Sequence, residues 1–458
     1  MAGKNGWHRL AWLVFASGLS LMLARPTAAE ITHILVTSSS DIGPFRGKGY
    51  REIQATMEGV APGGPYSVPV VLAFPKAAGD YNGFALIDVY NTVTVGDPKW
   101  VTGGRVLPVA RQLGQDYVFG SGNFYVGVLW DKVAAEFLRT GTIAAASDWY
   151  EILRDASLLA RNPAAAHFPS GFTLPRPADK VIAYGYSQSG MVLRGFYFRR
   201  LNTSKGDLTF DGALIVGARG LCRHLDRPLP FTGPPRGGPS RCDGVLSDGG
   251  KVIAINPETD VEWNGFNARG ETADYRVIEV AGVSHLPVTS VDFRGLGVPR
   301  QNPVDALPVF RAALTNLQRW LRGTDPPPSV YITLQEGPAG DLLGLPLKEA
   351  VRDADGNALG GVRLPHLPTA LEEGKVAGAP LGTYKGLDLD FKDTNGYFMR
   401  SGSFAPFSED RLRALYPNHD AYVSAVSLAA KDLVVKRYIL QEDADKYIEA
   451  GARSTIGR

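Results

Sequence analysis

The segment 181–190 reads Val-Ile-Ala-Tyr-Gly-Tyr-Ser-Gln-Ser-Gly, and its residue types suit nucleophilic attack by a serine. Residues 181–184 form an apolar run typical of a buried strand, a short turn follows, and residues 191–196 indicate the start of a helix. A strand, a strained turn and a helix in this order raise one hydroxyl above a sheet and direct it at a substrate carbonyl. The segment therefore predicts acyl-transfer chemistry at a serine.

Two serines in this turn compete for the role of nucleophile. The turn is so sharp that the residues two positions before and two positions after the nucleophile must be small. For Ser187 these positions hold Gly185 and Ser189, which are both small. For Ser189 the later position would hold Met191, whose side chain should clash. The spacing therefore predicts that Ser187 is the nucleophile.

A serine hydroxyl needs a base to take its proton, and the base needs a carboxylate that holds its tautomer. With a turn of this kind, the order along the chain is serine, acid, histidine. The strand-like run 252–255 leads to a loop that carries Glu258 and Asp260, and the next run, 275–280, leads to His285. The residues alone leave both carboxylates open as the acid. They single out His285 as the base.

The other six histidines do not follow a strand at the expected place. One falls in the N-terminal leader, three precede the acid loop or lack a strand before them, and two lie in the irregular C-terminal part: His8, His33, His167, His224, His366 and His419.

The elements that would position these residues form an alternating series, which predicts an α/β protein. Three short runs with Gly and Pro between them indicate an antiparallel edge: 34–37, 50–57 and 68–72. Strand-like runs then alternate with helical segments over residues 84–90, 124–130, 147–161, 181–184, 191–200, 210–216, 252–255 and 275–280. This alternation predicts a mostly parallel sheet with helices on both faces, and such sheets hold their chemistry at the carboxyl ends of the strands.

The part of the chain after the last strand divides into a helix and an extension. Asn302 and Pro303 are expected to cap and start the helix, and Gly323 with the prolines 326–328 is expected to end it. Its apolar stripe should pack on the sheet: Leu307, Phe310, Leu314, Leu317 and Leu321. Residues 329 to about 400 are irregular, and 408–416 and 420–450 are predicted helices. We expect 329–458 to pack on the main domain, 30–328, as a C-terminal extension.

The turn, the acid loop and the histidine loop resemble those of the α/β-hydrolase superfamily. With the segment 355–365, Asp-Gly-Asn-Ala-Leu-Gly-Gly-Val-Arg-Leu-Pro, the chain resembles a bacterial and fungal family of α/β-hydrolase domain proteins. The resemblance covers most of the mature chain and implies an α/β-hydrolase fold. It also implies a serine hydrolase that needs no cofactor, in which Ser187 attacks and His285 is the general base and acid.

The same resemblance implies roles for further residues. Superfamily members usually carry their acid four residues past the strand end, which favours Asp260 over Glu258. The oxyanion donors would be the N–H of Gln188 and a group in the loop after strand 84–90, near Asn91 or Thr92. Members often place a lid between the two strands that here flank residues 219–250, so this insertion is a candidate lid, with a plain surface excursion as the alternative.

The leader, the charge and the cysteines predict the cellular compartment. Basic residues precede the apolar run 10–23, and small residues follow it, which is the pattern of a signal peptide over residues 1–29. The mature protein would then be secreted or periplasmic. In that setting Cys222 and Cys242 are expected to form a disulfide that contributes about 3 kcal/mol, with two separate buried thiols as the alternative.

The formal charge is +2 and falls to −1 without the three basic residues of the leader, Lys4, Arg9 and Arg25. This balance argues against nucleic acid as a partner, and no later segment is apolar enough to span a membrane. The segment 353–357 opens like a calcium loop but lacks a closing glutamate, so we interpret it as a hairpin turn and expect no metal.

Together these observations predict an exported serine hydrolase that cleaves a small-molecule carboxylic ester through an acyl-enzyme. A lactonase, amidase or acyltransferase would use the same three residues. A binding protein of this fold without turnover is the alternative from another class, because fold alone does not imply activity.

Overall fold

The computed structural model describes the chain from residue 30 to its end, with gaps. The described ranges are 30–61, 64–91, 110–130, 149–166, 168–169, 172, 174–204, 206–218, 220–222, 240–242, 244–246, 248–263, 269–287, 292–337, 348–371, 376–391 and 398–458. The predicted signal peptide, 1–29, and most of the candidate lid lie outside these ranges.

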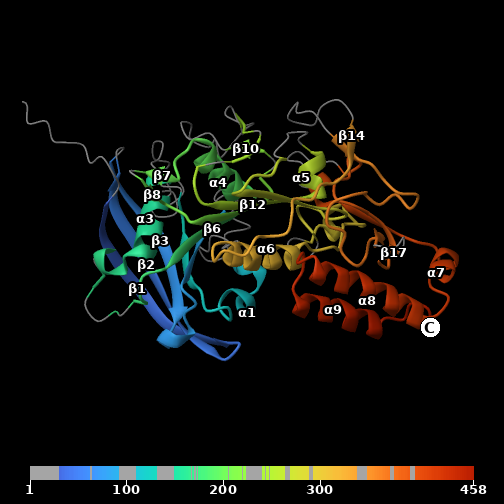
Figure 1. Ribbon diagram of the computed structural model, residues 1–458, viewed down its shortest axis with the longest axis horizontal. Helices are drawn as coiled ribbons and strands as arrows, with labels where there is room; N and C mark the ends of the chain where they lie inside the picture. The colour runs from blue at the N-terminus through green and yellow to red at the C-terminus, as the bar shows by residue number, and fades with distance from the viewer. Residues whose placement is uncertain are drawn as a thin grey trace, which may run out of the picture.

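A nine-stranded sheet runs through the described part of the molecule (Figure 1). Its order is β1-β2-β3-β5-β4-β6-β9-β12-β13, where β1 is Glu30–Phe45, β2 Lys48–Ala61, β3 Gly64–Pro75, β4 Phe84–Val89, β5 Phe124–Val128, β6 Lys180–Tyr186, β9 Gly212–Val216, β12 Lys251–Pro257 and β13 Tyr275–Val280. The first three strands are antiparallel, and β3 pairs antiparallel with β5. From β5 to β13 every pairing is parallel.

The burial of the strands follows from these pairings. Every residue of β4, β5 and β9 is buried, as expected for parallel strands that are covered on both faces. By contrast, β2 alternates between buried and partly exposed residues over much of its length. The predicted antiparallel edge and parallel centre are therefore both confirmed, although the edge strands are longer than their apolar runs.

Helices cover both faces of the parallel region. Helix α4, Gln188–Phe198, packs on β6 and β9, and α6, Leu307–Trp320, lies on the opposite face, beneath β9 and β12 (Figure 1). Helix α3, Trp149–Arg161, contacts β4, β5 and β6. The short α1, Gln115–Val118, contacts α6 through Tyr117, whose hydroxyl donates to the Arg311 carbonyl oxygen at 2.6 Å. Helix α5, Glu258–Glu262, directly follows β12.

The predicted start of α6 at Asn302 is wrong, because the helix begins at Leu307 after an Ala306 N-cap. Asn302 is fully buried, and its amide donates to the carbonyl oxygens of Gly282 and Lys385, 3.0 and 2.9 Å away. It thus joins two loops and does not cap a helix. The predicted end is confirmed, since the Gly323 N–H closes the last turn on Trp320.

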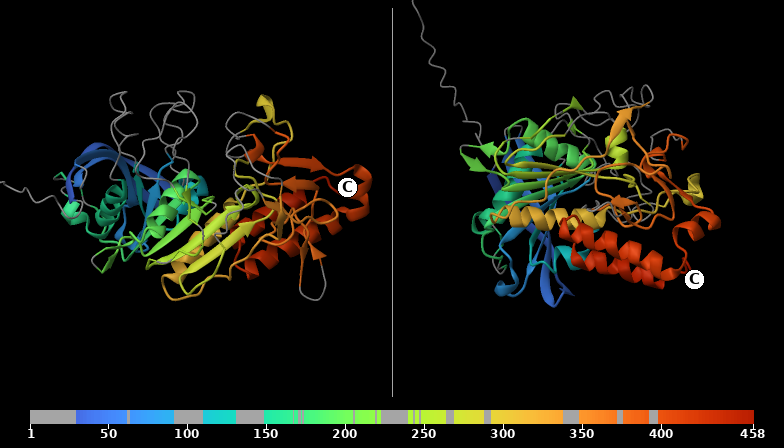
Figure 2. Two further views of the ribbon diagram at one scale, coloured as in Figure 1. Left: turned by 90° about the horizontal axis from the view of Figure 1, so that it is seen from above. Right: turned by 45° about the vertical axis from the view of Figure 1, so that its right-hand side comes forward.

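In its described residues, the C-terminal extension combines short strand pairs with the helices α7, α8 and α9. Helices α8, His419–Val435, and α9, Gln441–Arg453, lie side by side on the side of the sheet that α6 covers (Figures 1 and 2). The prediction that 420–450 is helical is confirmed over α8 and α9, and residues 436–440 separate the two helices. Helix α7 is Glu409–Leu415. Ala430, Leu433 and Ala444 belong to the main hydrophobic core.

The irregular stretch of the extension continues the edge of the sheet. Val330 bridges Ile278, and Val362 bridges Val280, both in parallel orientation next to β13. The short strands pair antiparallel: β7 Thr203–Ser204 with β8 Asp207–Leu208, β10 Leu221–Cys222 with β11 Ser240–Arg241, β14 Leu334–Glu336 with β15 Lys348–Ala350, β16 Thr369–Ala370 with β17 Val376–Ala377, and β18 Gly382–Lys385 with β19 Ser403–Pro406.

Candidate active site

Ser187 stands at the turn between β6 and α4 in a strained conformation. Its φ of 56° is positive, which L-residues rarely adopt and which costs on the order of 1–3 kcal/mol. The Ser187 N–H donates to the Val216 carbonyl oxygen on the neighbouring strand at 2.9 Å, and the Ser187 carbonyl accepts from the Met191 N–H in the helix. These two hydrogen bonds stabilise the strained backbone of Ser187, and its hydroxyl projects from the carboxyl end of the sheet.

The residues two positions away from Ser187 explain why the turn can form. A Cβ on Gly185 would lie 2.6 Å from the Ser189 carbonyl oxygen, so no larger residue fits there. The Ser189 hydroxyl is buried, accepts from the Tyr186 N–H at 3.0 Å and donates to the Tyr186 carbonyl oxygen at 3.1 Å. Ser189 is thus engaged inside the turn, whereas Ser187 faces the histidine.

The structure brings together the serine, histidine and aspartate that the sequence predicted. His285 Nε2 lies 2.9 Å from Ser187 Oγ, and His285 Nδ1 lies 2.8 Å from Asp260 Oδ2. His285 and Asp260 are only 1% and 2% exposed, so little solvent screens their interaction. In this arrangement the imidazole can take the hydroxyl proton, while the carboxylate fixes the ring and stabilises its charged form.

Asp260 lies in helix α5, although the sequence predicted a loop after β12. Glu258 precedes it in the same helix turn but is directed elsewhere. The Glu258 carboxylate accepts from the N–H groups of Gly282 and Gly386, at 2.6 and 2.9 Å, and pairs with the Arg352 guanidinium at 2.9 Å. Of the two carboxylates that the residues alone left open, only Asp260 contacts the imidazole among the described contacts.

Gly217 is a residue of this site that sequence reasoning missed. It follows β9 at φ +61°, and a Cβ there would lie 3.1 Å from His285 Cε1 and 3.2 Å from Asp260 Oδ2. A glycine is therefore needed where the histidine and aspartate meet. Its signal was present in the sequence, as a glycine directly after a buried strand.

The Tyr186 side chain also contacts the histidine. Its ring stacks on the His285 ring with centroids 5.1 Å apart and an angle of 23° between the planes. Its hydroxyl donates a short hydrogen bond to the His285 carbonyl oxygen. Thr259 holds the same loop from another side, since its hydroxyl oxygen accepts from the His285 N–H at 2.9 Å. These contacts fix both the backbone and the ring of the histidine.

The predicted oxyanion donors lie around the nucleophile. Gln188 is the first residue of α4, so the helix itself does not use its backbone N–H. Asn91 follows β4, and its Nδ2 lies 3.5 Å from the Tyr186 carbonyl oxygen, which places it beside the turn. Thr92, the other candidate, is outside the described residues. The donor role of Gln188 and Asn91 stays a prediction.

The two cysteines form the expected disulfide, with their Cα atoms 5.6 Å apart. Cys222 and Cys242 join β10 to the residue after β11, at the two ends of the insertion. Arg194 of α4 donates to the Cys242 and Gly244 carbonyl oxygens, so the base of the insertion packs on the helix that follows the nucleophile. A role of residues 219–250 as a lid stays a prediction.

The aspartates of the segment 353–357 form ion pairs with arginines. In the segment 353–357, whose opening resembles a calcium loop, Asp353 pairs with Arg363 and Asp355 with Arg411, each at 2.9 Å, and the backbone forms a turn from Asp353 to Gly356. No cluster of three potential metal ligands is found among the residues that the structure describes. Within the same residues, no helix has the length and apolar character needed to cross a membrane.

The described histidines of the extension have their own partners, and none of their described contacts is with Ser187, Asp260 or His285. Burial lowers the pKa of His366 to about 3, so this imidazole is neutral beside Tyr384. His419 begins α8, so its assignment to irregular chain was wrong, and its ring nitrogens lie near the carbonyl oxygens of Ile456 and Ala452. His167 and His224 are outside the described ranges.

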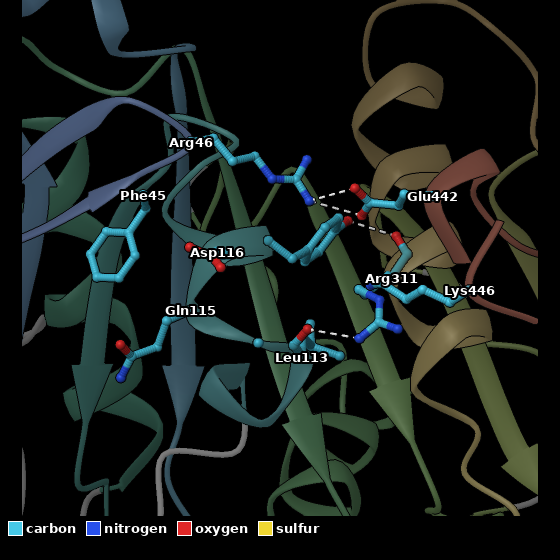
Figure 3. Close-up of a pocket in the computed structure, with 10 residues that line it drawn as sticks. Phe45, Arg46, Leu113, Gln115, Asp116, Arg311, Glu442 and Lys446 are labelled. Carbon is cyan, nitrogen blue, oxygen red and sulfur yellow. Dashed lines mark hydrogen bonds and ion pairs between the residues drawn. The ribbon is translucent and has the colours of Figure 1, made fainter. Parts of the chain in front are cut away.

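Figure 3 shows a cavity of about 370 Å³ whose described lining includes none of Ser187, Asp260 and His285. It is bounded by the β1–β2 turn, α1, α6 and α9. Across the cavity, Arg46 Nη2 donates to both carboxylate oxygens of Glu442. At its edge, Arg311 forms an ion pair with Asp443. These ion pairs tie the N-terminal strands and α6 to the last helix of the extension.

The family of the chain follows from its sequence as a whole. The model of the alpha/beta hydrolase domain family matches residues 47–449, which include the sheet, the site and nearly all of the extension. The chain therefore belongs to this family, and the predicted fold is confirmed. No curated protein matches the sequence.

Several solved structures are similar to parts of the chain at low sequence identity. They include a glucuronoyl esterase from Teredinibacter turnerae (13% identity, 42% of this chain and 50% of that chain, TM-score 0.25) and the rice cell wall degrading esterase LipA from Xanthomonas oryzae (15%, 40% and 50%, 0.24). A glucuronoyl esterase from Solibacter usitatus is similar at 13% identity, over 43% of this chain and 53% of that chain, with a TM-score of 0.25. The matches span about half the length of these proteins.

Proposed function

We propose that this protein is an exported serine hydrolase that cleaves a carboxylic ester through an acyl-enzyme. The observation that carries the proposal is the hydrogen-bonded series Ser187 Oγ, His285 Nε2, His285 Nδ1 and Asp260 Oδ2, with distances of 2.9 and 2.8 Å, on a strained turn. A scaffold needs neither the strained turn nor a buried carboxylate that holds a histidine ring against a serine.

In the first half of the reaction, Ser187 Oγ attacks the ester carbonyl while His285 Nε2 takes its proton. The oxyanion that forms accepts hydrogen bonds from the Gln188 N–H and from a donor near Asn91. When the intermediate collapses, the carbon–oxygen bond to the alcohol breaks and His285 gives its proton to the leaving oxygen. The acyl group stays on Ser187.

In the second half, a water molecule attacks the acyl-enzyme and gives its proton to His285. Collapse of the second intermediate releases the carboxylic acid and returns the proton to Ser187 Oγ. Asp260 stays ionised throughout and stabilises the imidazolium. Export is the second part of the proposal, and the leader pattern together with the Cys222–Cys242 disulfide supports it.

The test is labelling with a fluorophosphonate, followed by mass spectrometry to locate the adduct, in wild type and in Ser187→Ala. We expect an adduct on Ser187 in wild type and none in the variant, whose circular dichroism should be unchanged. A folded wild-type protein that does not react would favour a binding protein without turnover. A panel of esters, lactones and amides then separates the esterase from a lactonase or an amidase.

A further inference from the structure

Helix α5 carries the proposed acid but is too short to hold its own orientation. It has five residues, Glu258–Glu262, and isolated helices need about 12–15 residues to be even marginally stable in water. Its rotation about the helix axis, and therefore the direction of Asp260, must be set by tertiary contacts.

Those contacts lie on the face of α5 opposite Asp260. Residues four apart share a helix face, whereas residues two apart point to opposite sides, because each residue turns the helix by about 100°. Glu258 and Glu262 therefore lie on one face and Asp260 on the other. Both glutamates are buried, with side chains 0% and 3% exposed. A single group from the extension contacts both of them.

That group is Arg352. Its Nη2 lies 2.9 Å from Glu258 Oε1 and 2.9 Å from Glu262 Oε1. Glu262 Oε1 also accepts from the Ala350 N–H at 2.8 Å, two residues before the arginine. The extension thus holds the back of α5 at two points, one helical turn apart.

Glu258 also contacts the loop that carries His285. Its Oε2 accepts from the N–H of Gly282, three residues before His285, and its Oε1 accepts from the N–H of Gly386 in the extension. The neighbouring Thr259 donates to the Gly386 carbonyl oxygen and accepts from the His285 N–H. One residue pair of α5 therefore connects the acid, the histidine loop and the extension.

The turn that resembled a calcium loop presents this arginine. Arg352 bridges Ala358 across the turn, and Arg352 Nη1 donates to the Gly356 carbonyl oxygen at 3.2 Å. Asn357 is fully buried, and its Oδ1 accepts from the Tyr384 N–H at 2.8 Å, which holds the strand that leads to Gly386. Contacts of this turn therefore position both Arg352 and Gly386 beside Glu258.

We propose that Arg352 is a positioning residue for the serine, histidine and aspartate, so that the C-terminal extension is part of the active site. Arg352 holds Glu258 and Glu262, which orients Asp260, and Glu258 in turn holds the histidine loop. This inference rests on the proposed function, since it concerns the geometry of the same three residues.

The experiment compares Arg352→Met with Arg311→Met, which removes a different buried ion pair between the main domain and the extension. We expect Arg352→Met to lower kcat for a p-nitrophenyl ester by about tenfold to a hundredfold, because small displacements of reacting groups have effects of this size. KM should stay within about twofold of wild type, since substrate binding is not removed. Fluorophosphonate labelling of Ser187 should slow by the same factor as kcat.

Two comparisons separate positioning from general destabilisation. Arg311→Met should keep the wild-type kcat at a temperature where all variants are folded. If Arg352→Met does not fold, Arg352→Lys decides the matter, because an ammonium cannot reproduce the contacts of the planar guanidinium and should lower kcat by about tenfold.

Each outcome bears on the inference. An unchanged kcat in folded Arg352→Met or Arg352→Lys overturns it, and so does an equal loss of kcat in Arg311→Met. If wild type reacts with the fluorophosphonate but Arg352→Met reacts equally fast, this inference fails while the proposed function stands. A wild-type protein that does not react overturns both.

Discussion

The hydroxyl of Tyr186 donates a hydrogen bond to the carbonyl oxygen of His285, and the two rings stack with centroids 5.1 Å apart. The residue before the nucleophile thus holds the residue proposed as its base. One side chain thereby links the turn after β6 to the loop after β13, which are 99 residues apart in the sequence.

Tyr186→Phe tests this link, because it keeps the ring stack and removes only the hydrogen bond. One hydrogen bond contributes about 0.5–1.5 kcal/mol, so we expect kcat to fall by about threefold to tenfold. Tyr81→Phe is the matched control, since the buried Tyr81 hydroxyl makes no hydrogen bond with the described residues. Equal kcat values for the two variants would contradict the role of Tyr186.

Ser189→Ala tests the assignment of the nucleophile from the other serine. The change removes the two hydrogen bonds to the Tyr186 backbone and leaves a buried N–H without its acceptor, so we expect a loss of about 1–3 kcal/mol of stability. The fluorophosphonate adduct should still form on Ser187. Loss of the adduct from folded Ser189→Ala would count against Ser187 as the nucleophile.

Asp260→Asn and Glu258→Gln test the choice of acid. Asparagine in place of the acid stabilises the wrong histidine tautomer, so we expect kcat to fall by about 10⁴-fold. Glu258→Gln disturbs only the contacts behind Asp260 and should lower kcat by no more than about a hundredfold. Steady-state kinetics on folded protein measures both. An equal loss in the two variants would remove the reason to prefer Asp260.

Gly217→Ala tests the close approach at the end of β9. The new methyl group would lie 3.1 Å from His285 Cε1, so it should displace the imidazole and lower kcat by about tenfold or more. Gly206→Ala is the control, because Gly206 has φ +91° but nothing within 4 Å of the added carbon. Both variants should lose stability, on the order of 1–3 kcal/mol from strain, but only Gly217→Ala should lose activity.

Glu262→Gln tests the charge balance behind α5 through the pH dependence of stability. Burial, followed by the nearby Glu258 charge, raises the pKa of Glu262 from 4.5 to about 8, although the Arg352 guanidinium acts in the opposite direction. The folded state then binds a proton that the unfolded state releases above pH 4.5. The contribution is therefore complete below pH 4.5 and is lost as the pH rises through about 8.

We expect the free energy of unfolding of wild type to fall between these two pH values, by up to about 1.4 kcal/mol per pH unit from this group. In Glu262→Gln this part of the slope should disappear. Urea denaturation from pH 5 to 9 measures it, with the exposed Glu409→Gln as control. A wild-type slope that persists in Glu262→Gln would show that another group titrates.

Local patterns in the sequence were enough to place the central strands and the residues that stand at their ends. Buried parallel strands need continuous apolar runs, and the turn around Ser187 needs small neighbours, so both are visible in single segments. Because parallel strands end at one edge of a sheet, their order also implied that His285 and a carboxylate of the segment after β12, Glu258 or Asp260, would lie near Ser187.

The contacts that orient these residues were decided only by the tertiary structure. Arg352 lies 90 or more residues from Glu258 and Glu262, and Gly386 lies 128 residues from Glu258. Contacts between residues so far apart produce no local pattern in the sequence from which they could be predicted. Asn302 reads as a helix cap because its local neighbours allow that role, yet its amide joins two distant loops. The residues at the carboxyl ends of the strands can therefore be identified from single segments, whereas the contacts that hold their side chains form only when distant parts of the chain pack together.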